Sequence, residues 1–114
     1  MSQIIRDRMT LKELDKLAAN FFETMIKGVV DVEREIIAVD TQLHSDLESL
    51  LLQNGSKQQN LWGINLYPKE TGESFLEFDS MINVRPARGN RSRGVESPAI
   101  RQKIEQVIAR RVVP

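Results

Sequence analysis

The segment from Val29 to Val39 limits the possible folds more than any other part of this sequence. As one continuous strand it would mix charged and apolar residues on both faces, because alternate side chains of a strand point to opposite sides. A turn at residues 33–35 removes this conflict, since four apolar side chains then share one face: Val30, Val32, Ile37 and Val39. The pattern therefore predicts an antiparallel β-hairpin, with Asp31 and Ala38 on its other face.

Two later segments alternate in the same way. Residues 61–67 and 75–85 place apolar side chains at alternate positions, the spacing of a strand with one buried face. Turn-forming residues, Pro68 and Gly72, lie between them. The patterns predict a strand at Leu61–Tyr67 and one long strand at Phe75–Arg85. The buried face would carry Trp62, Ile64, Leu66, Leu76, Phe78, Ile82 and Val84.

Three segments show the apolar spacing and end signals of helices. Thr10–Glu13 is a capping box, whose two side chains satisfy free N–H groups at a helix start; this helix would end at Gly28. A second helix lies within Thr41–Asn54, and a further capping box at Ser45–Glu48 leaves its first residue open. Ser97–Pro98 joins a favoured N-cap to a favoured first helical residue, so it predicts the start of the last helix.

The predicted elements follow the order α-β-β-α-β-β-α. A chain of 114 residues fits one domain, and this mixture of hairpins and helices is typical of the α+β class. We therefore expect a single α+β domain at residues 1–114, with residues 1–9 as an N-terminal arm. The expected sheet is mostly antiparallel and four-stranded, with the helices on one face.

The composition excludes several kinds of site. The sequence contains no cysteine, so it forms no disulfide, thiolate metal site or cysteine nucleophile, and this fits a reducing compartment. No apolar run approaches the roughly 20 residues that a membrane-spanning helix needs. Residues 1–7 also lack the apolar stretch of a signal peptide. We therefore expect a cytoplasmic protein without a membrane partner.

The net charge of zero hides an asymmetry along the chain. Residues 1–83 carry 8 Lys and Arg against 14 Asp and Glu, a net charge of −6; residues 84–114 carry 8 against 2, a net charge of +6. Two interpretations stay open. The two parts neutralise each other within the fold, or the basic part faces an anionic partner.

Six short stretches between Val29 and Arg93 form a distinctive series. They are Val29–Glu33, Leu43–Asp46, Asn54–Gln58, Leu61–Tyr67, Asp79–Pro86 and Asn90–Ser92. In these stretches the chain resembles a family of small bacterial proteins, a domain of unknown function. The resemblance implies a stand-alone bacterial cytoplasmic protein, and it implies nothing about chemistry.

The segment 85–94 contains four arginines and no acidic residue. Guanidinium groups donate in pairs to carboxylates and phosphates, and the segment leads into a helix N-terminus, where free N–H groups favour anions. It has neither a Walker spacing nor a dinucleotide fingerprint. We predict an anion site here, with a solvated loop or internal ion pairs as the alternative. Its residues would be Arg85, Arg88, Asn90, Arg91, Ser92 and Arg93.

The predicted sheet has a second face, opposite the buried one. It would present the polar residues Asp31, Asn65, Tyr67, Glu77, Asp79, Asn83 and Arg85. Carboxylate oxygens bind Mg²⁺, and paired carboxylates exchange protons, but antiparallel sheets also commonly leave one face in water. Three interpretations stay open: a solvated or dimer-covered face, a ligand surface, or a metal or catalytic site.

His44 is the only histidine in the sequence and lies at or just before the start of the second predicted helix. It could share a helical face with Glu48 and act as a general base or metal ligand. The chain has no H-E-x-x-H motif and no second histidine, which argues against a zinc site. We therefore favour a capping or structural role.

These observations favour a binding module for a phosphate- or carboxylate-bearing ligand at the arginine-rich segment. The ligand would be a small molecule or a nucleic acid, although no RRM, KH or zinc-finger signature is present. One alternative is a protein-interaction or homodimerisation domain, because the first helix carries adjacent Phe21 and Phe22. A metal-assisted phosphoester hydrolase is less favoured. No cofactor is expected, and no catalytic residue is assigned.

Overall fold

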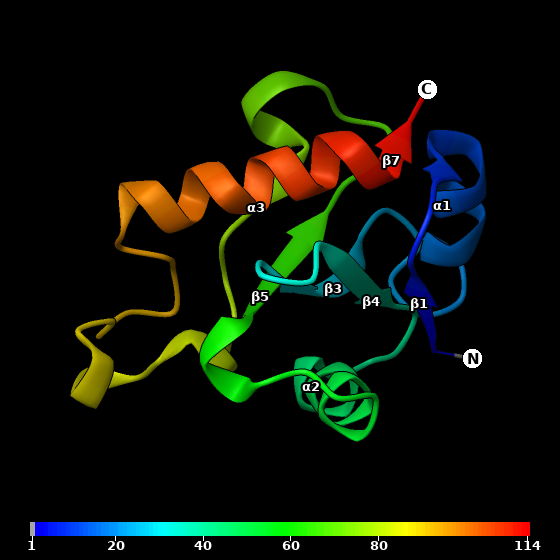
Figure 1. The fold of residues 1–114 in the computed structure, drawn as a ribbon. Coiled ribbons are helices and arrows are strands. Elements are labelled where there is room, and N and C mark those ends of the chain that lie inside the picture. Colours follow the sequence, from blue (N-terminus) through cyan, green and yellow to red (C-terminus); the bar gives the residue numbers. More distant parts are fainter. Residues whose placement is uncertain (1) are drawn as a thin grey trace.

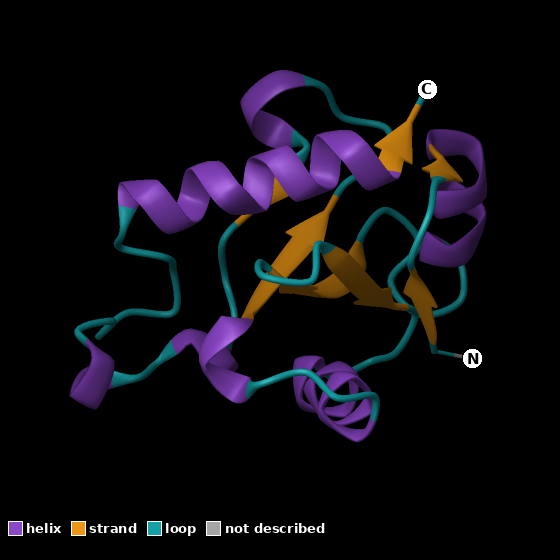
Figure 2. Cartoon of the chain, in the orientation of Figure 1, coloured by secondary structure: helices purple, strands orange, loops and turns teal. Residues whose placement is uncertain are grey.

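The computed structural model describes residues 2–114 and confirms the α+β class. A five-stranded antiparallel sheet with the strand order β1-β4-β3-β5-β6 forms the middle layer. Figure 1 shows α3 above this sheet and α2 below it, and Figure 2 shows the long loops that join them. The elements are β1 (Gln3–Ile5), β2 (Met9–Thr10), α1 (Leu11–Ala18), β3 (Ile26–Asp31), β4 (Ile36–Val39), α2 (His44–Gln53), η1 (Gln58–Asn60), β5 (Leu61–Leu66), η2 (Gly72–Ser74), β6 (Leu76–Glu77), η3 (Met81–Asn83), η4 (Pro86–Arg88), α3 (Pro98–Arg111) and β7 (Val112–Val113).

The predicted hairpin is confirmed. β3 and β4 pair antiparallel, with Val30 opposite Ile37. Asp31 is fully buried, and its Oδ1 accepts hydrogen bonds of 2.9 Å from the N–H groups of Glu33 and Arg34. The carboxylate therefore stabilises the hairpin turn. The prediction that Asp31 lies on an open sheet face is wrong.

Two apolar layers cover opposite faces of the sheet. The larger layer lies against α1 and α3, and it includes Trp62, Ile64 and Leu66 of β5 as predicted. The smaller layer lies against α2 and contains Val29, Ile36, Ala38, Leu47, Leu51 and Leu61. The prediction that all helices lie on one face is therefore wrong. Strands β3 and β4 are apolar on both faces, a pattern that needs a cover on each side.

The first helix is shorter than predicted. It begins at the capping box, where the Thr10 hydroxyl accepts a hydrogen bond of 3.1 Å from the N–H of Glu13, but it ends at Ala18. Gly28 lies inside β3 instead of ending a helix. Because β3 pairs with both β4 and β5, two hydrogen-bonded ladders satisfy its backbone, and this tertiary pairing outweighs the helical spacing.

The first residues are part of the fold. Gln3–Ile5 form the edge strand β1 and pair with β4, while Met9–Thr10 pair in parallel with β7 near the C-terminus. The Ile5 and Met9 side chains are buried in the larger apolar layer. From Gln3 onward the predicted N-terminal arm is therefore part of the sheets and the core.

The long strand predicted at Phe75–Arg85 is wrong, as is the four-stranded sheet. Strand β6 contains only Leu76 and Glu77, which pair with Leu66 and Asn65 of β5. The chain then leaves the sheet edge and forms the short 3₁₀ helices η3 and η4. Hydrogen bonds from side chains replace the missing strand, as described below.

The other two helices lie where the sequence predicts them. Helix α2 begins at His44 with Leu43 as its N-cap, so neither Thr41 nor Ser45 starts it. Helix α3 begins after Ser97, whose hydroxyl accepts a hydrogen bond of 3.3 Å from the N–H of Ile100. Within residues 2–114, none of the helices has the length and apolar character needed to cross a membrane.

Candidate functional site

Asn83 ties the arginine loop (residues 85–94) to the free edge of β5. Its buried side chain accepts a hydrogen bond of 2.8 Å from the N–H of Gly63 and donates one of 2.9 Å to the Gly63 carbonyl. The same amide also donates to the Arg93 carbonyl, at 2.9 Å. Asn83 therefore satisfies the sheet edge in place of a strand, and the prediction that it lies on an open face is wrong.

Gly63 allows this segment to lie directly against the sheet. A Cβ atom built on Gly63 would lie 2.4 Å from the Cβ and 2.5 Å from the Oγ of Ser80. Ser80 is itself 1% exposed, so it has no room to move away. The absence of a side chain at this position sets how closely η3 approaches β5.

Asn90 organises the interior of the arginine loop. Its Nδ2 donates to the carbonyl oxygens of Asn83, Ser92 and Gly94 at 2.7, 3.1 and 2.8 Å, and its Oδ1 accepts from the N–H of Glu96 at 2.8 Å. The residue is 5% exposed. Asn90 therefore fixes the loop conformation, and its amide is not available to a ligand.

A carboxylate of the chain occupies two backbone donors of the arginine loop. The Glu96 Oε2 accepts hydrogen bonds from the N–H groups of Arg91 and Ser92. These bonds hold the pKa of Glu96 below its ordinary value, with the bond from Arg91 as the main cause. The N–H groups of Arg91 and Ser92 are therefore already paired with an internal anion.

The acidic residues near β6 also have partners within the chain. The Arg93 Nε lies 2.7 Å from the Asp79 Oδ1. The Glu77 Oε1 accepts hydrogen bonds of 2.8 Å from Asn65 and 3.0 Å from Tyr67. Burial, followed by the hydrogen bond to Glu77, raises the pKa of Tyr67. Asn65 is 5% exposed, so it too is absent from an open face.

These carboxylates do not gather into a metal site. Among residues 2–114, no group of three or more His, Asp or Glu side chains is placed to hold a metal ion. Glu77 and Asp79 instead receive hydrogen bonds from the neighbouring Tyr67, Asn65 and Arg93. The geometry therefore gives no support to the metal-assisted hydrolase.

His44 connects α2 to the sheet. The residue is 8% exposed, and its Nε2 lies 2.7 Å from the carbonyl oxygen of Ile64. Burial is the main cause that lowers the pKa of His44, and the bond to Ile64 opposes it. A neutral ring with its proton on Nε2 fits this carbonyl. This arrangement supports the structural role that we favoured.

Arg85 is the most deeply placed arginine of the loop, with 12% of its side chain exposed. Its Nε donates to the Ile82 carbonyl at 3.1 Å, its Nη2 donates to the Leu61 carbonyl, and its guanidinium lies 4.8 Å from the centre of the Trp62 ring. Nη1 is buried and has no hydrogen-bond partner among the described residues. Burial lowers the pKa of Arg85, and the charge of Glu48 opposes this effect.

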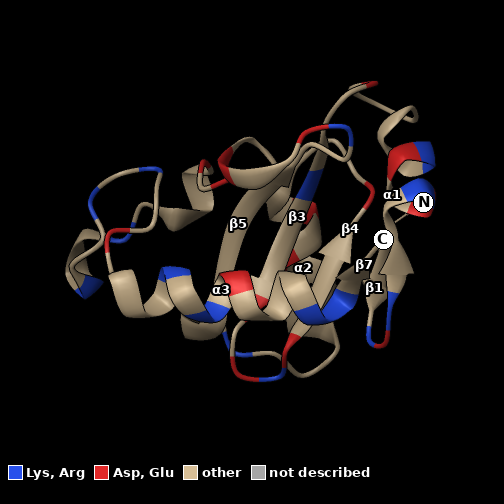
Figure 3. Ribbon diagram, turned by 90° about the horizontal axis from the view of Figure 1, so that it is seen from above, with Lys and Arg blue, Asp and Glu red and all other residues tan. Residues whose placement is uncertain are grey.

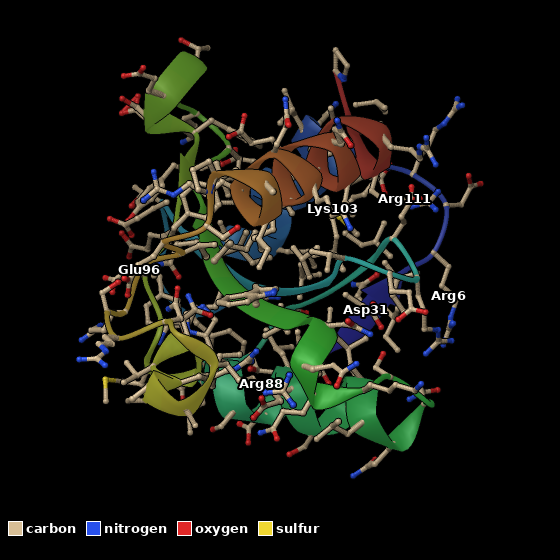
Figure 4. All side chains as sticks on the ribbon, turned by 60° about the vertical axis from the view of Figure 1, so that its left-hand side comes forward. Arg6, Asp31, Arg88, Glu96, Lys103 and Arg111 are labelled. Carbon is tan, nitrogen blue, oxygen red and sulfur yellow. The ribbon has the colours of Figure 1, made fainter. Side chains whose placement is uncertain are left out.

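A groove of about 350 Å³ opens where the arginine loop meets α2 and η1. Arg85 and Arg88 lie along it, and Figure 4 shows Arg88 near α2 and well apart from Glu96. The groove is lined by Glu48, Gln58, Gln59, Met81, Ile82, Val84, Arg85, Ala87 and Arg88. Nothing in the local sequence around Glu48, Gln58, Gln59 and Met81 indicates that they share a groove with the arginines, and Glu48 was considered only in a capping box and as a partner of His44.

Ion pairs between the two parts of the chain neutralise some of the charge asymmetry. In the described part of the chain, the arginines at 85, 93 and 110 form ion pairs with Glu48, Asp79 and Glu35. Figure 3 shows basic positions spread along the loop that precedes α3. Arg88 is exposed, and its side chain forms no ion pair with a described residue. Of the predicted anion-binding side chains, only Arg85 and Arg88 line the groove.

Comparison with known proteins places the chain in a family. Residues 3–111 match the family model described as "Protein of unknown function (DUF5674)". The chain belongs to this family. The match confirms the expected kind of family and extends beyond the Val29–Arg93 segment that carried the resemblance. Neither the curated proteins nor the solved structures include a match to the chain.

Proposed function

We propose that the protein binds an anionic ligand in the groove between α2 and the arginine loop. The observation that supports this most is the buried Arg85 guanidinium at the groove, because its Nη1 has no hydrogen-bond partner among the described residues. A buried cation without a full set of acceptors is costly, and the negative charge of a phosphate or carboxylate in the groove would stabilise it. Arg88 adds a second positive charge to the same groove.

This proposal moves the site from the whole arginine loop to two of its residues. Arg93 pairs with Asp79, and the backbone donors of Arg91 and Ser92 hold Glu96. Asn90 holds the loop in place. The ligand would therefore contact Arg85 and Arg88, and the other predicted residues would not take part in binding.

Titration calorimetry with phosphate, AMP and phenylacetate tests the proposal. We expect binding that weakens with added salt, because the partners are oppositely charged. Saturation at about 100 times Kd should also raise the free energy of unfolding by about 2.7 kcal/mol. Arg88→Ala should weaken binding about tenfold or more, since a charged hydrogen bond contributes about 1.5–3 kcal/mol.

Arg91→Ala is the matched control, because Arg91 is also exposed and on the same loop but does not line the groove. The control should bind as the unmodified protein does. Equal binding by the Arg88→Ala variant and the unmodified protein would contradict the proposal.

A second candidate function is protein docking, which a larger groove between η2 and α3 favours. This groove has a volume of about 900 Å³, and Phe75, Phe78, Ile108 and Val112 contribute apolar side chains to it. Phe21 and Phe22 are also 42% and 36% exposed, which favours the homodimer that we considered. Sedimentation equilibrium over a wide concentration range tests this; a single monomeric species throughout would contradict the homodimer.

The bacterial origin and the cytoplasmic location stay predictions. They rest on the family resemblance and on the composition of the chain, which contains no cysteine. Fractionation of cells that produce the protein, followed by immunodetection, tests the location.

A further inference from the structure

Glu48 places a negative charge inside the same groove as the two arginines. Its Oε2 lies 3.9 Å from the Arg85 Nη2, and the Glu48 side chain is 15% exposed. The distance is too long for a hydrogen bond, so the two groups interact as charges and not as a closed bidentate pair. Arg85, Arg88 and Glu48 together bring one net positive charge to the groove.

This arrangement affects singly and doubly charged ligands in different ways. One negative charge on a ligand neutralises the net positive charge of the groove. A second negative charge would meet the Glu48 carboxylate, and repulsion between like charges is strong where solvent is partly excluded. A site gains specificity when it contains such a repulsive element as well as an attractive one.

The remaining walls of the groove are suited to an uncharged body on the ligand. Met81 is 67% exposed, and it lines the groove together with the apolar side chains of Ile82, Val84 and Ala87. Methionine adapts its shape to apolar and aromatic groups. The side-chain amides of Gln58 and Gln59 also line the groove, and they can bond neutral ester or carbonyl oxygens.

We infer that the groove selects anions with a single negative charge on an apolar body, and that Glu48 discriminates against dianions. Phosphodiesters and carboxylates share this chemistry. Glu48 is in this view a specificity-determining residue. The inference rests on the proposed function, since it concerns the same groove.

Calorimetry at about pH 8 with three aromatic probes tests the inference. Phenyl phosphate carries two charges there, because the second pKa of a phosphate ester is about 6. Methyl phenyl phosphate and phenylacetate each carry one charge, and comparison of the two separates phosphodiester from carboxylate ligands. We expect each monoanion that binds to do so about tenfold more tightly than phenyl phosphate, and this preference to disappear in Glu48→Gln.

Glu73→Gln serves as the control, because Glu73 is exposed and does not line this groove. It should keep the preference for monoanions. The comparison of probes on the unmodified protein needs no variant, so the inference stays testable even if Glu48→Gln folds poorly.

The outcomes separate the two proposals. If phenyl phosphate binds the unmodified protein as tightly as the monoanions do, the inference is wrong and the proposed function stands. If all three probes bind but Glu48→Gln keeps the preference, Glu48 is not its cause. If none of the probes binds, both the inference and the proposed anion site are wrong.

Discussion

The side-chain amide of Asn83 forms two hydrogen bonds with the backbone of Gly63, at 2.8 and 2.9 Å. The amide thereby occupies one N–H and one carbonyl of β5 where strand β6 no longer runs alongside. Arg85 follows two residues later, and its Nη2 donates to the Leu61 carbonyl on the same strand. The position of Arg85 at the groove therefore depends on contacts between the loop and the edge of β5.

Replacing Asn83 with alanine should lower the free energy of unfolding by about 2–4 kcal/mol. The variant leaves buried backbone groups without partners, and each such group costs about 1–3 kcal/mol. Urea denaturation followed by circular dichroism measures the change. Gln53→Ala, at an exposed position of α2, should stay within about 0.5 kcal/mol of the unmodified protein. Equal stability of the two variants would show that the Asn83 bonds are dispensable.

Gly63→Ala should destabilise the fold by about 1–3 kcal/mol, as expected when a methyl group is forced into a filled space. The new Cβ would lie 2.4 Å from the Ser80 Cβ. The double variant Gly63→Ala, Ser80→Gly removes this clash and should recover part of the loss. A double-mutant cycle by chemical denaturation measures the coupling. Strict additivity of the two changes would contradict direct contact as the cause.

His44 should make the protein less stable as the pH falls below neutrality. Burial, the largest effect, lowers the pKa of His44 in the folded protein, while the unfolded chain retains a value of about 6.5. The unfolded state therefore binds the proton first, so stability is full above about pH 6.5 and decreases as the pH falls towards the folded-state pKa.

Denaturation curves at several pH values test this prediction, with His44→Gln as the comparison. The variant should lose the part of the pH dependence that lies just below about pH 6.5. It also loses the contact with Ile64, so its overall stability should be lower at every pH. An unchanged pH dependence in the variant would contradict the role assigned to the buried ring.

Glu96→Ala should speed hydrogen exchange at the amides of Arg91 and Ser92, because it removes their shared acceptor. Glu105→Ala, an exposed change on α3, should leave both amides unaffected. In the unmodified protein these two hydrogen bonds stabilise the fold while Glu96 is ionised. Because the pKa of Glu96 is lowered in the folded protein, this stabilisation is fully present above the ordinary pKa of glutamate, and it is lost as the pH falls through the lowered pKa. Exchange rates that do not respond to Glu96→Ala would contradict this account.

Several parts of the fold follow from residues that are close together in the sequence. The alternation around Asp31 predicts the β3–β4 hairpin, the pattern at 61–66 predicts β5, and Thr10 and Ser97 mark the starts of α1 and α3. These signals are local, since strand parity and helix capping act within a few residues. Residues 85–94 contain four arginines and no acidic residue, and this composition also predicts a basic loop.

Long-range contacts decided the rest. Gly28 lies in a strand because β4 and β5 pair with it from both sides, and the predicted long strand stops at Glu77 because Asn83, twenty residues from Gly63, pairs with the β5 edge instead. Nothing in the local sequence distinguishes the four arginines of the loop from one another. They differ in whether the fold places an acidic side chain beside them. Asp79 pairs with Arg93, whereas Arg88 has no such acid among the described residues.

Local sequence patterns thus predict the α+β class, the hairpin, the starts of α1 and α3 and the presence of a basic loop. Which face of the sheet α2 covers, which arginines meet at the groove, and the position of Glu48 beside them all depend on contacts between distant segments. The physical reason is that local backbone preferences act within a few residues, while the pairing of charges and of free strand edges depends on distances in space. Those distances exist only once the chain has folded.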